Sequence, residues 1–513
     1  MRPVAWSSSY LFRWPFGISI VTSNCTGRSV AHRTAADGRR SFRGVGSIAS
    51  SGSTTVTPKY SRFRRRLVLG ALAVVLVLAV GVWFVVPTGG GDDAGEAEAR
   101  LPDVPAAAPV LAALGSQAPV PDAPVLSGEL APLLAAPALG PGVAAEVVDV
   151  ASGGVLLDQD ADDPVTPAST AKLLTAVAAL TTLGPAATLE TTVVAGATPD
   201  EVVLVGGGDP TLSRTAPSLT YPGAPTLDDL AAQVRGSLPA GTTVTRVVVD
   251  SSLFSGPLTA PGWGPGDAPS SYAAPITATA VDGARVRPGE EARSGQPGLD
   301  AGAALAAALG VPRATVALGS APDGAPTLGA VRSAPVARLA EQALTGSDNV
   351  LTESLARHVA LARGLPVTFE GSAQAVTGAL SDAGLDVTGV ALSDGSGLSL
   401  DDRVPVSLLA DLLAGAADGS LPDASAVLSG LPVAGYDGTL ADRGDADPPG
   451  APGAVRAKTG TLLGVHGLAG TVVTADGRLL VFAVVADAAP GTEQAAQGAL
   501  DDVAAALAAC GCR

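Results

Sequence analysis

Apolar residues form one long continuous segment near the N-terminus and many shorter, periodic runs further along the chain. Residues 67–86 are all apolar, and a helix of these 20 residues is long enough to cross the roughly 30 Å hydrocarbon core of a bilayer. We therefore expect one transmembrane helix at 67–86. The shorter runs begin at about residue 126 and predict a globular region from there to the C-terminus.

Two periodicities recur in this globular region. Alternation of apolar residues predicts strands, and apolar residues three or four positions apart predict amphipathic helices. The predicted strands are 143–150, 155–157, 201–205, 244–250, 467–474 and 478–486, the last two joined by a hairpin turn at Asp476-Gly477. The predicted helices are 169–183, 335–344, 350–363 and 493–509. Residues 188–318 mix short strand-like runs with many Gly and Pro turns.

Charge is distributed very unevenly around the long apolar segment. Residues 1–66 hold 12 Lys or Arg and one acid, whereas the rest of the chain holds 19 basic and 47 acidic residues. By the positive-inside rule, 1–66 is a basic cytoplasmic tail and the remainder is exported. The tail shows no sustained periodicity, so we expect it to be disordered, and the Pro-, Ala- and Gly-rich residues 87–125 read as a linker.

A cleaved signal peptide is the alternative interpretation of the apolar segment, and it would give a secreted protein. The segment is longer than a usual signal-peptide core, and no A-x-A cleavage site lies close behind it. We therefore expect a single-pass protein of the cell membrane, with its folded region outside the cytoplasm.

Composition excludes several classes of function. The pI of about 4.5 argues against a nucleic-acid partner. The three Cys and three His have no spacing typical of metal ligands, so no metal is expected. Apolar residues make up 47% of the chain, which is sufficient for a large core.

Scarce residue types point to the candidate chemistry. After position 66 the chain has only two Lys, Lys172 and Lys458, and a single Asn, Asn349. All three fall in short motifs, Ser169-Thr170-Ala171-Lys172, Ser347-Asp348-Asn349 and Lys458-Thr459-Gly460-Thr461. Arg cannot serve as a base, whereas Lys can lose its proton in a suitable site.

Each motif also has a structural interpretation. An S-x-x-K pattern is often a solvated lysine, yet on a helix it places an amine beside a hydroxyl that it can activate as a nucleophile. Ser347-Asp348-Asn349 between two predicted helices is also typical of a helix N-cap. The motif that begins at Lys458 is equally typical of an edge strand that enters a turn. Their coincidence with the scarce Lys and Asn residues favours a joint catalytic role.

The set of S-x-x-K, S-D-N and K-T-G motifs resembles that of penicillin-binding proteins and serine β-lactamases. The separation of 178 positions between Ser169 and Ser347 is similar to that of the D-alanyl-D-alanine carboxypeptidase/endopeptidase family (peptidase family S13, low-molecular-mass class C penicillin-binding proteins). Further stretches that resemble this family are 206–212, 249–254, 262–263 and 394–399.

The resemblance implies an α/β (α+β) fold of the penicillin-binding-protein/serine β-lactamase type, preceded here by the transmembrane helix. Its core, an antiparallel sheet flanked by helices, is expected from residues 126–187 and 319–513, with a mostly β inserted domain at 188–318. The implied substrates are peptidoglycan stem peptides, the implied inhibitors are β-lactam antibiotics, and no cofactor is needed.

The resemblance also implies a role for each motif residue. Ser169 attacks the carbonyl of a D-Ala-D-Ala bond, Lys172 is the general base, Ser347 and Lys458 serve proton transfer to the leaving amine, and Asn349 holds the substrate amide. The substrate-binding residues are Thr459, Gly460 and Thr461. The backbone N–H groups of residues 169 and 461 form the oxyanion hole.

Three other functions share this core. A β-lactamase would need a group that activates the deacylating water, and no E-x-x-x-N loop follows Ser347. A penicillin-binding-like sensor or scaffold and an esterase are the others. One departure concerns specificity: Leu400 stands where many members of the family have Arg, and Arg403 is a candidate substitute.

Overall fold

The structure is a computed structural model that describes residues 118–443 and 452–511. The expected cytoplasmic tail, the transmembrane segment 67–86 and most of the linker lie outside these residues. Within the described part of the chain, no helix is both long and apolar enough to cross a bilayer. The folded region begins with α2 (Ala123–Leu134), a few residues before the expected start at 126.

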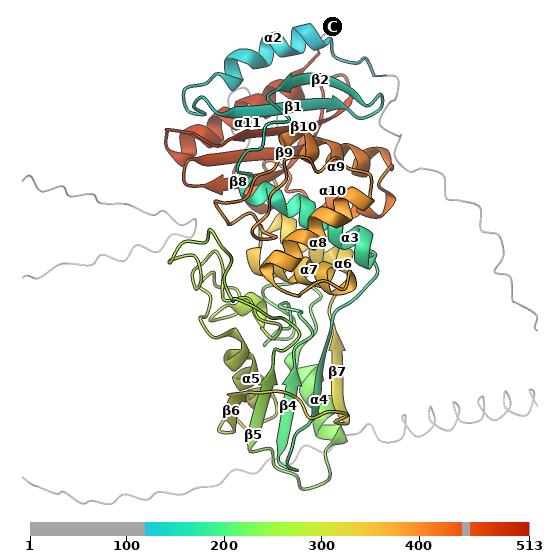
Figure 1. Ribbon diagram of the computed structural model, residues 1–513, viewed down its shortest axis with the longest axis vertical. Helices are drawn as coiled ribbons and strands as arrows, with labels where there is room; N and C mark the ends of the chain where they lie inside the picture. Colours follow the sequence, from blue (N-terminus) through green and yellow to red (C-terminus); the bar gives the residue numbers. More distant parts are fainter. Residues whose placement is uncertain (1–117, 444–451, 512–513) are drawn as a thin grey trace, which may run out of the picture. The chain divides into compact units, whose positions relative to one another are not determined.

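A five-stranded antiparallel sheet joins the two ends of the folded region (Figure 1). Its order is β2-β1-β10-β9-β8, with bounds β1 (Val143–Asp149), β2 (Gly154–Gln159), β8 (Val455–Leu462), β9 (Val465–Val473) and β10 (Leu479–Ala486). Val143 pairs with Ala486 and Asp149 with Leu480. Edge strand β8 carries the third motif.

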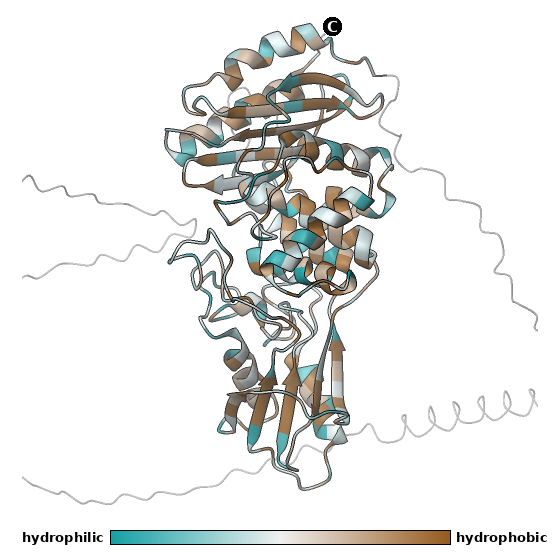
Figure 2. Cartoon of the chain, viewed as in Figure 1, coloured by the Kyte–Doolittle hydropathy of each residue, from teal (hydrophilic) through white to brown (hydrophobic). Residues whose placement is uncertain are grey.

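Successive side chains of each strand point to opposite faces of the sheet, so the core has two layers, one on each face. Val147, Phe482 and Val484 face α2 and α11 (Glu493–Ala509). Val148 and Val485 face the opposite, helical side. Both sides of the sheet are therefore buried, and Figure 2 shows its strands as apolar along most of their length.

The helical side contains the elements that carry the first two motifs. Its members are α3 (Lys172–Leu183), α6 (Val336–Thr345), α7 (Asn349–Ala362), α8 (Phe369–Asp382), α9 (Val406–Asp418) and α10 (Ala426–Gly430). They share one apolar cluster with the inner face of the sheet. Short 3-10 turns precede α3 and follow α9 and α10, namely η1 (Ala168–Ala171), η3 (Pro422–Ser425) and η4 (Gly438–Leu440).

The insert has its own five-stranded sheet, of order β6-β5-β4-β3-β7. The bounds are β3 (Glu190–Ala195), β4 (Glu201–Val205), β5 (Arg246–Asp250), β6 (Thr315–Leu318) and β7 (Thr327–Arg332), with helices α4 (Leu227–Ser237) and α5 (Pro297–Ala308) and the short turn η2 (Asp282–Ala284). The first and last strands, β3 and β7, are antiparallel neighbours. Both connections to the core therefore run side by side.

Two expectations about the insert need correction. It is a mixed α/β unit and not mostly β, because the parallel pairs β4–β5 and β5–β6 require crossover connections, which α4 and α5 supply. Its sheet also includes β7, so the insert continues past residue 318 to Arg332.

An apolar cluster that includes Ile276 of the insert, Val350 and Phe369 packs the insert against α7 and α8.

Candidate active site

The first motif lies on a 3-10 turn and not on a continuous helix from 169 to 183. Ala168 has a left-handed φ of 48°, η1 contains Ser169, and α3 begins only at Lys172. In a 3-10 turn, side chains at i and i+3 are eclipsed, which brings these two residues closer than an α-helix does. The Lys172 Nζ lies 2.8 Å from the Ser169 Oγ.

The Lys172 side chain is fully buried and makes two further hydrogen bonds. Its Nζ donates to Asn349 Oδ1 at 2.5 Å and to the carbonyl oxygen of Ser396 at 2.7 Å. Burial lowers the pKa of Lys172 to about 8, although the negative charges of Asp394 and Glu353 oppose this effect. An amine with such a pKa is still mainly protonated near physiological pH, but its neutral fraction there is far larger than that of an ordinary lysine.

In the second motif, one residue caps a helix and the next one points into the candidate site. Asp348 is the N-cap of α7, and its side chain accepts from Leu351 N at 3.1 Å. Asn349 instead directs its side chain to the site, with Oδ1 toward Lys172 and Nδ2 donating to Tyr272 O at 3.2 Å. Ser347 is half-buried in the turn before α7, with a φ of 49°.

The third motif lies on β8 beside the turn that carries Ser169. Gly460 is required there, because a Cβ atom would lie 2.9 Å from Pro167 O. Lys458 is fully buried and donates to Thr459 O at 2.8 Å. Burial and the positive charge of Lys172 lower the pKa of Lys458 well below its usual range. Thr461 is exposed at the end of the motif.

The loop 394–399 completes the site, and the sequence interpretation assigned it no role. The buried Asp394 carboxylate accepts from the backbone N–H groups of Ser396, Gly397 and Ser399 at 2.6–2.9 Å. These bonds fix the carbonyl that Lys172 contacts. Gly397, at φ 72°, lies against the first motif, since a Cβ atom there would be 1.9 Å from Ala168 O.

Buried acidic groups surround Asp394. Glu353 forms a buried ion pair with Arg357 at 3.2 Å, and burial together with Asp394 raises the pKa of Glu353 to about 7. Burial and the neighbouring Asp394 charge raise the pKa of Asp402 to about 9. The raised pKa favours the protonated form of Asp402, which limits the negative charge near Lys172.

The side chain of Arg403, the candidate substitute for the family arginine, is hydrogen-bonded to neighbouring residues of the core. It donates to Thr166 Oγ1 at 3.0 Å and to Leu400 O at 2.9 Å. Leu400 itself is half exposed. The structure therefore places an apolar side chain at the surface where a guanidinium was expected from the family pattern.

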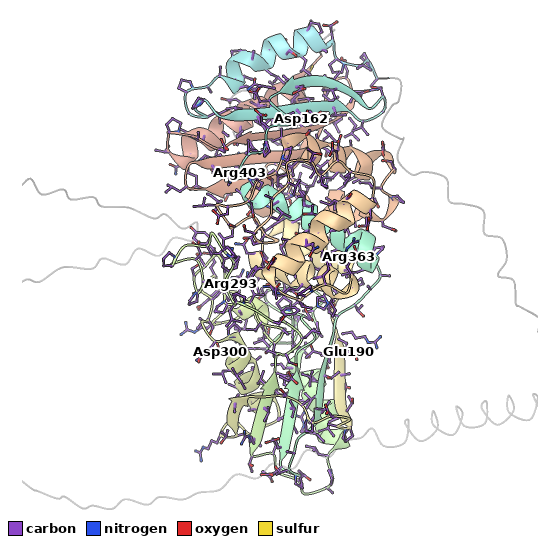
Figure 3. The ribbon with its side chains drawn as sticks, viewed as in Figure 1. Asp162, Glu190, Arg293, Asp300, Arg363 and Arg403 are labelled. Carbon is purple, nitrogen blue, oxygen red and sulfur yellow. The ribbon has the colours of Figure 1, made fainter. Side chains whose placement is uncertain are left out.

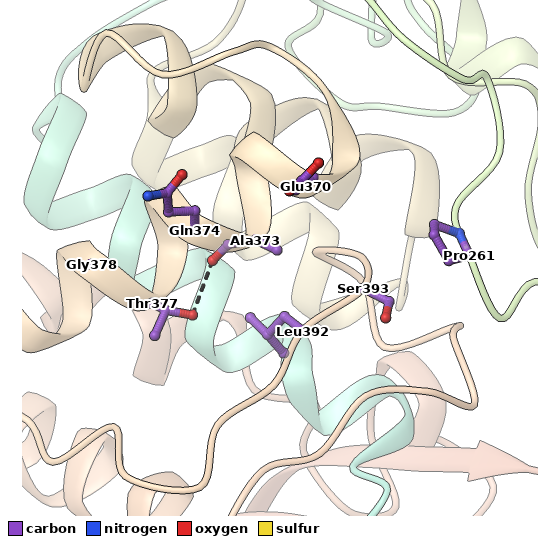
Figure 4. A pocket seen from close by; sticks show the side chains of 8 residues that line it. All are labelled: Pro261, Glu370, Ala373, Gln374, Thr377, Gly378, Leu392 and Ser393. Carbon is purple, nitrogen blue, oxygen red and sulfur yellow. Dashed lines mark hydrogen bonds between the residues drawn. The ribbon is translucent and has the colours of Figure 1, made fainter.

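A shallow pocket of about 520 Å³ lies between α8 and the residues that precede Asp394 (Figure 4). Thr377 of α8 and Ser393 line it, together with Pro261 of the insert. None of the three motifs contributes a residue to this pocket. The candidate active site is thus defined by the geometry around Lys172 and not by this concavity.

Comparison with known proteins agrees with this geometry. Residues 126–298 and 287–508 match the D-Ala-D-Ala carboxypeptidase 3 (S13) family. The chain is 42% identical to carboxypeptidase DacB of Mycolicibacterium smegmatis over 463 residues, 88% of this chain and 99% of that protein. It is 40% identical to carboxypeptidase Rv3627c of Mycobacterium tuberculosis, with the same coverage.

A solved structure shows the same fold. The crystal structure of penicillin binding protein 4 from Haemophilus influenzae superposes with a TM-score of 0.60, at 23% identity, over 73% of this chain and 97% of that one. A second structure of that protein, in complex with a novel β-lactam, superposes with a TM-score of 0.56. The chain therefore belongs to the D-Ala-D-Ala carboxypeptidase 3 (S13) family of serine peptidases.

Proposed function

We propose that the protein hydrolyses D-Ala-D-Ala bonds of peptidoglycan stem peptides through an acyl-enzyme on Ser169, with Lys172 as the general base. The observation that carries this proposal is the set of three contacts around the Lys172 amine. Membership of the family supplies the reaction class, and these contacts supply the roles of the residues.

The contacts determine where the lone pair of a neutral Lys172 points. A neutral amine has two N–H groups and one lone pair. Asn349 Oδ1 and Ser396 O can only accept hydrogen bonds, so they take both N–H groups. The lone pair then faces Ser169 Oγ, the one neighbour of the three with a proton to donate. This arrangement prepares Ser169 for deprotonation as it attacks.

Acylation follows from this geometry. Ser169 Oγ bonds to the substrate carbonyl carbon as its proton moves to Lys172 Nζ. The resulting oxyanion is held by the backbone N–H groups of Ser169 and Thr461, each worth about 3 kcal/mol of barrier in comparable sites. As the C–N bond breaks, Ser347, assisted by Lys458, gives its hydroxyl proton to the leaving amine and receives in exchange the proton that Lys172 took from Ser169. Water then hydrolyses the ester and regenerates the serine.

Substrate orientation is assigned to the third motif and to Asn349. Thr459 and Thr461 lie on edge strand β8, where an extended peptide can pair with the strand, and they orient the terminal carboxylate near Lys458. Asn349 offers its amide to the substrate.

Labelling with a fluorescent penicillin tests the nucleophile. The expected result is one covalent adduct, mapped by mass to Ser169, together with release of D-Ala from a D-Ala-D-Ala peptide. The Ser169→Ala variant should lose both signals. An adduct on another residue would refute the assignment. A rapidly hydrolysed adduct would indicate a β-lactamase, and slow binding without peptide hydrolysis would indicate a sensor.

The balance between carboxypeptidase and endopeptidase activity requires a natural substrate. Purified cross-linked peptidoglycan, digested with the enzyme and analysed by mass, separates the two: loss of terminal D-Ala marks the first, and cleaved cross-links mark the second. We expect loss of terminal D-Ala, since the matching family and both mycobacterial relatives are named carboxypeptidases, and cleaved cross-links in addition would establish endopeptidase activity.

The proposal includes an uncleaved membrane anchor at 67–86, which places the catalytic region outside the cytoplasm. Its support is the length of the apolar segment and the arginines that precede it. Full-length protein should remain in the membrane fraction and be digested by protease added from outside. A soluble form that begins between residues 87 and 100 would instead indicate a cleaved signal peptide.

A further inference from the structure

The second motif is bound to the insert through the carboxylate of Asp348. Asp348 Oδ2 accepts from Tyr221 Oη at 2.7 Å, Arg293 Nη2 at 3.0 Å and Arg285 Nη2 at 3.2 Å. All three partners belong to the insert, and Arg293 is itself almost fully buried. Burial alone would raise the pKa of Asp348, but the two guanidinium groups hold it well below its usual range. The carboxylate is therefore ionised at any pH at which the protein works.

Arg293 differs from Arg285 in what else it contacts. Its backbone N–H donates to Ser270 O at 3.1 Å, its Nε donates to Ser271 O at 3.4 Å, and its Nη1 donates to Gly283 O. Arg285 instead bonds to Tyr221 and to the carbonyl of Asp282. Both arginines neutralise Asp348, but Arg293 also ties it to the segment 270–272.

That segment leads back to the catalytic amine. The carbonyl of Tyr272 accepts from Asn349 Nδ2 at 3.2 Å. Because the amide nitrogen is held there, the amide oxygen faces Lys172 Nζ at 2.5 Å. These contacts connect Asp348 to Arg293, Arg293 to the segment 271–272, and this segment to Asn349. Because Asn349 directly follows Asp348 in the chain, the connection returns to the residue next to its start. Figure 3 shows Arg293 where the insert meets the helical side.

We propose that Arg293 is a positioning residue for acylation: it holds Asp348 and the segment 270–272 together, fixes the Asn349 amide, and thereby directs the lone pair of Lys172 at Ser169. This role rests on the proposed function of Lys172 as general base. It assigns the insert a part in the chemistry, although the insert contributes none of the three motifs.

Comparison of Arg293→Lys with Arg285→Lys tests the proposal in the full-length protein. Each variant keeps a positive charge beside Asp348, but the ammonium group at 293 lacks the rigid planar fork that directs Nη2 at Asp348 and Nε at Ser271 O together. Acylation by a fluorescent penicillin, measured from pH 6 to pH 10, should slow at least tenfold in Arg293→Lys. Arg285→Lys should change the rate less than threefold. Thermal unfolding of both variants controls for loss of structure.

The pH profile separates positioning from a merely structural effect. With its Asn349 contact loosened, protonated Lys172 loses a hydrogen bond to its charge, so the midpoint of the acylation profile should move to lower pH. The other titratable groups near Lys172, which are Lys458, Asp348, Glu353, Asp394 and Asp402, are the same in both variants, so their titration contributes equally to both profiles.

A double-mutant cycle completes the test. In an Asn349→Ala background there is no amide to position, so Arg293→Lys should cause no additional slowing. Equal slowing in the two arginine variants, or full additivity with Asn349→Ala, would overturn the positioning role. If Arg293→Lys does not fold, Asp348→Asn replaces it in the same cycle. Failure of the proposed function is distinct, since it would appear as an adduct away from Ser169 or as near-normal acylation in Lys172→Arg.

Discussion

The indole N–H of Trp263 donates to the carboxylate of Asp394 over 2.6 Å. Trp263 belongs to the insert, and Asp394 organises the core loop whose Ser396 carbonyl contacts Lys172. The insert therefore contacts one acceptor of the Lys172 amine directly, since Tyr272 O accepts from Asn349, and supports the other, Ser396 O, only indirectly through Trp263 and Asp394.

Trp263→Phe should weaken both stability and acylation. Phenylalanine retains an aromatic ring against Phe369, which the indole contacts edge-on at 5.5 Å, but it removes the donor to a buried carboxylate. A hydrogen bond to a charged group contributes about 2 kcal/mol, so the free energy of unfolding should fall by about that amount. Urea denaturation and penicillin acylation measure the two effects. Unchanged acylation in a destabilised variant would confine Trp263 to a structural role.

Lys172→Arg and Lys458→Arg should differ in acylation. Both lysines are fully buried, so both variants carry a similar overpacking cost of about 1–3 kcal/mol in stability. Guanidinium cannot act as a base at neutral pH, so Lys172→Arg should abolish acylation. Lys458→Arg supplies a positive charge and hydrogen-bond donors at this position, so it should leave a reduced but measurable rate. Near-normal acylation in Lys172→Arg would contradict the assignment of the general base.

The acylation rate of the native protein should rise with pH and reach half its plateau near pH 8. Only neutral Lys172 accepts the Ser169 proton, and burial lowers the pKa of this lysine to about 8. The reactive fraction therefore decreases about tenfold for each pH unit below the midpoint. Stopped-flow measurement with a chromogenic β-lactam gives the profile. A rate that stayed constant from pH 6 to pH 9 would show that the lysine is already neutral at pH 6 or is not the base.

Gly397→Ala should damage the site more than Gly464→Ala. Both glycines have a left-handed φ, of 72° and 75°, so each substitution incurs a backbone cost of about 1 kcal/mol. A Cβ atom at 397 would also lie 1.9 Å from Ala168 O, whereas the nearest atom to one at 464 is 3.7 Å away. Gly397→Ala should therefore displace the turn that carries Ser169. Equal acylation rates in the two variants would show that the turn tolerates the shift.

Periodicity predicted the elements whose two faces differ in polarity. The predicted helix at 493–509 coincides with α11, and the predicted strand at 201–205 coincides with β4. Helix α5 gave no such signal because its residues are mainly Ala and Gly, and α9 gave none because it is apolar over most of its surface. The start of α3 was misplaced because the local pattern does not distinguish a 3-10 turn from an α-helix.

The site residues with chemically distinctive side chains could be predicted from the sequence. Lys172, Asn349 and Ser169 do come together in the structure. The carbonyl groups of Ser396 and Tyr272 were not predictable, because every residue carries a backbone carbonyl and only tertiary structure selects which one meets the amine. The same holds for Arg293, since nothing local to it indicates a partner at Asp348.

The pairing of β1 with β10 imposes an order of assembly on the protein. Val143 has its partner at Ala486, so the core sheet cannot close until nearly the whole polypeptide has been synthesised. The insert, by contrast, contains all of its own strands between β3 and β7 and can complete its sheet earlier. We expect a nascent chain to hold a folded insert beside an unassembled catalytic region. Hydrolytic activity then arises only once the last strands of the core sheet have paired.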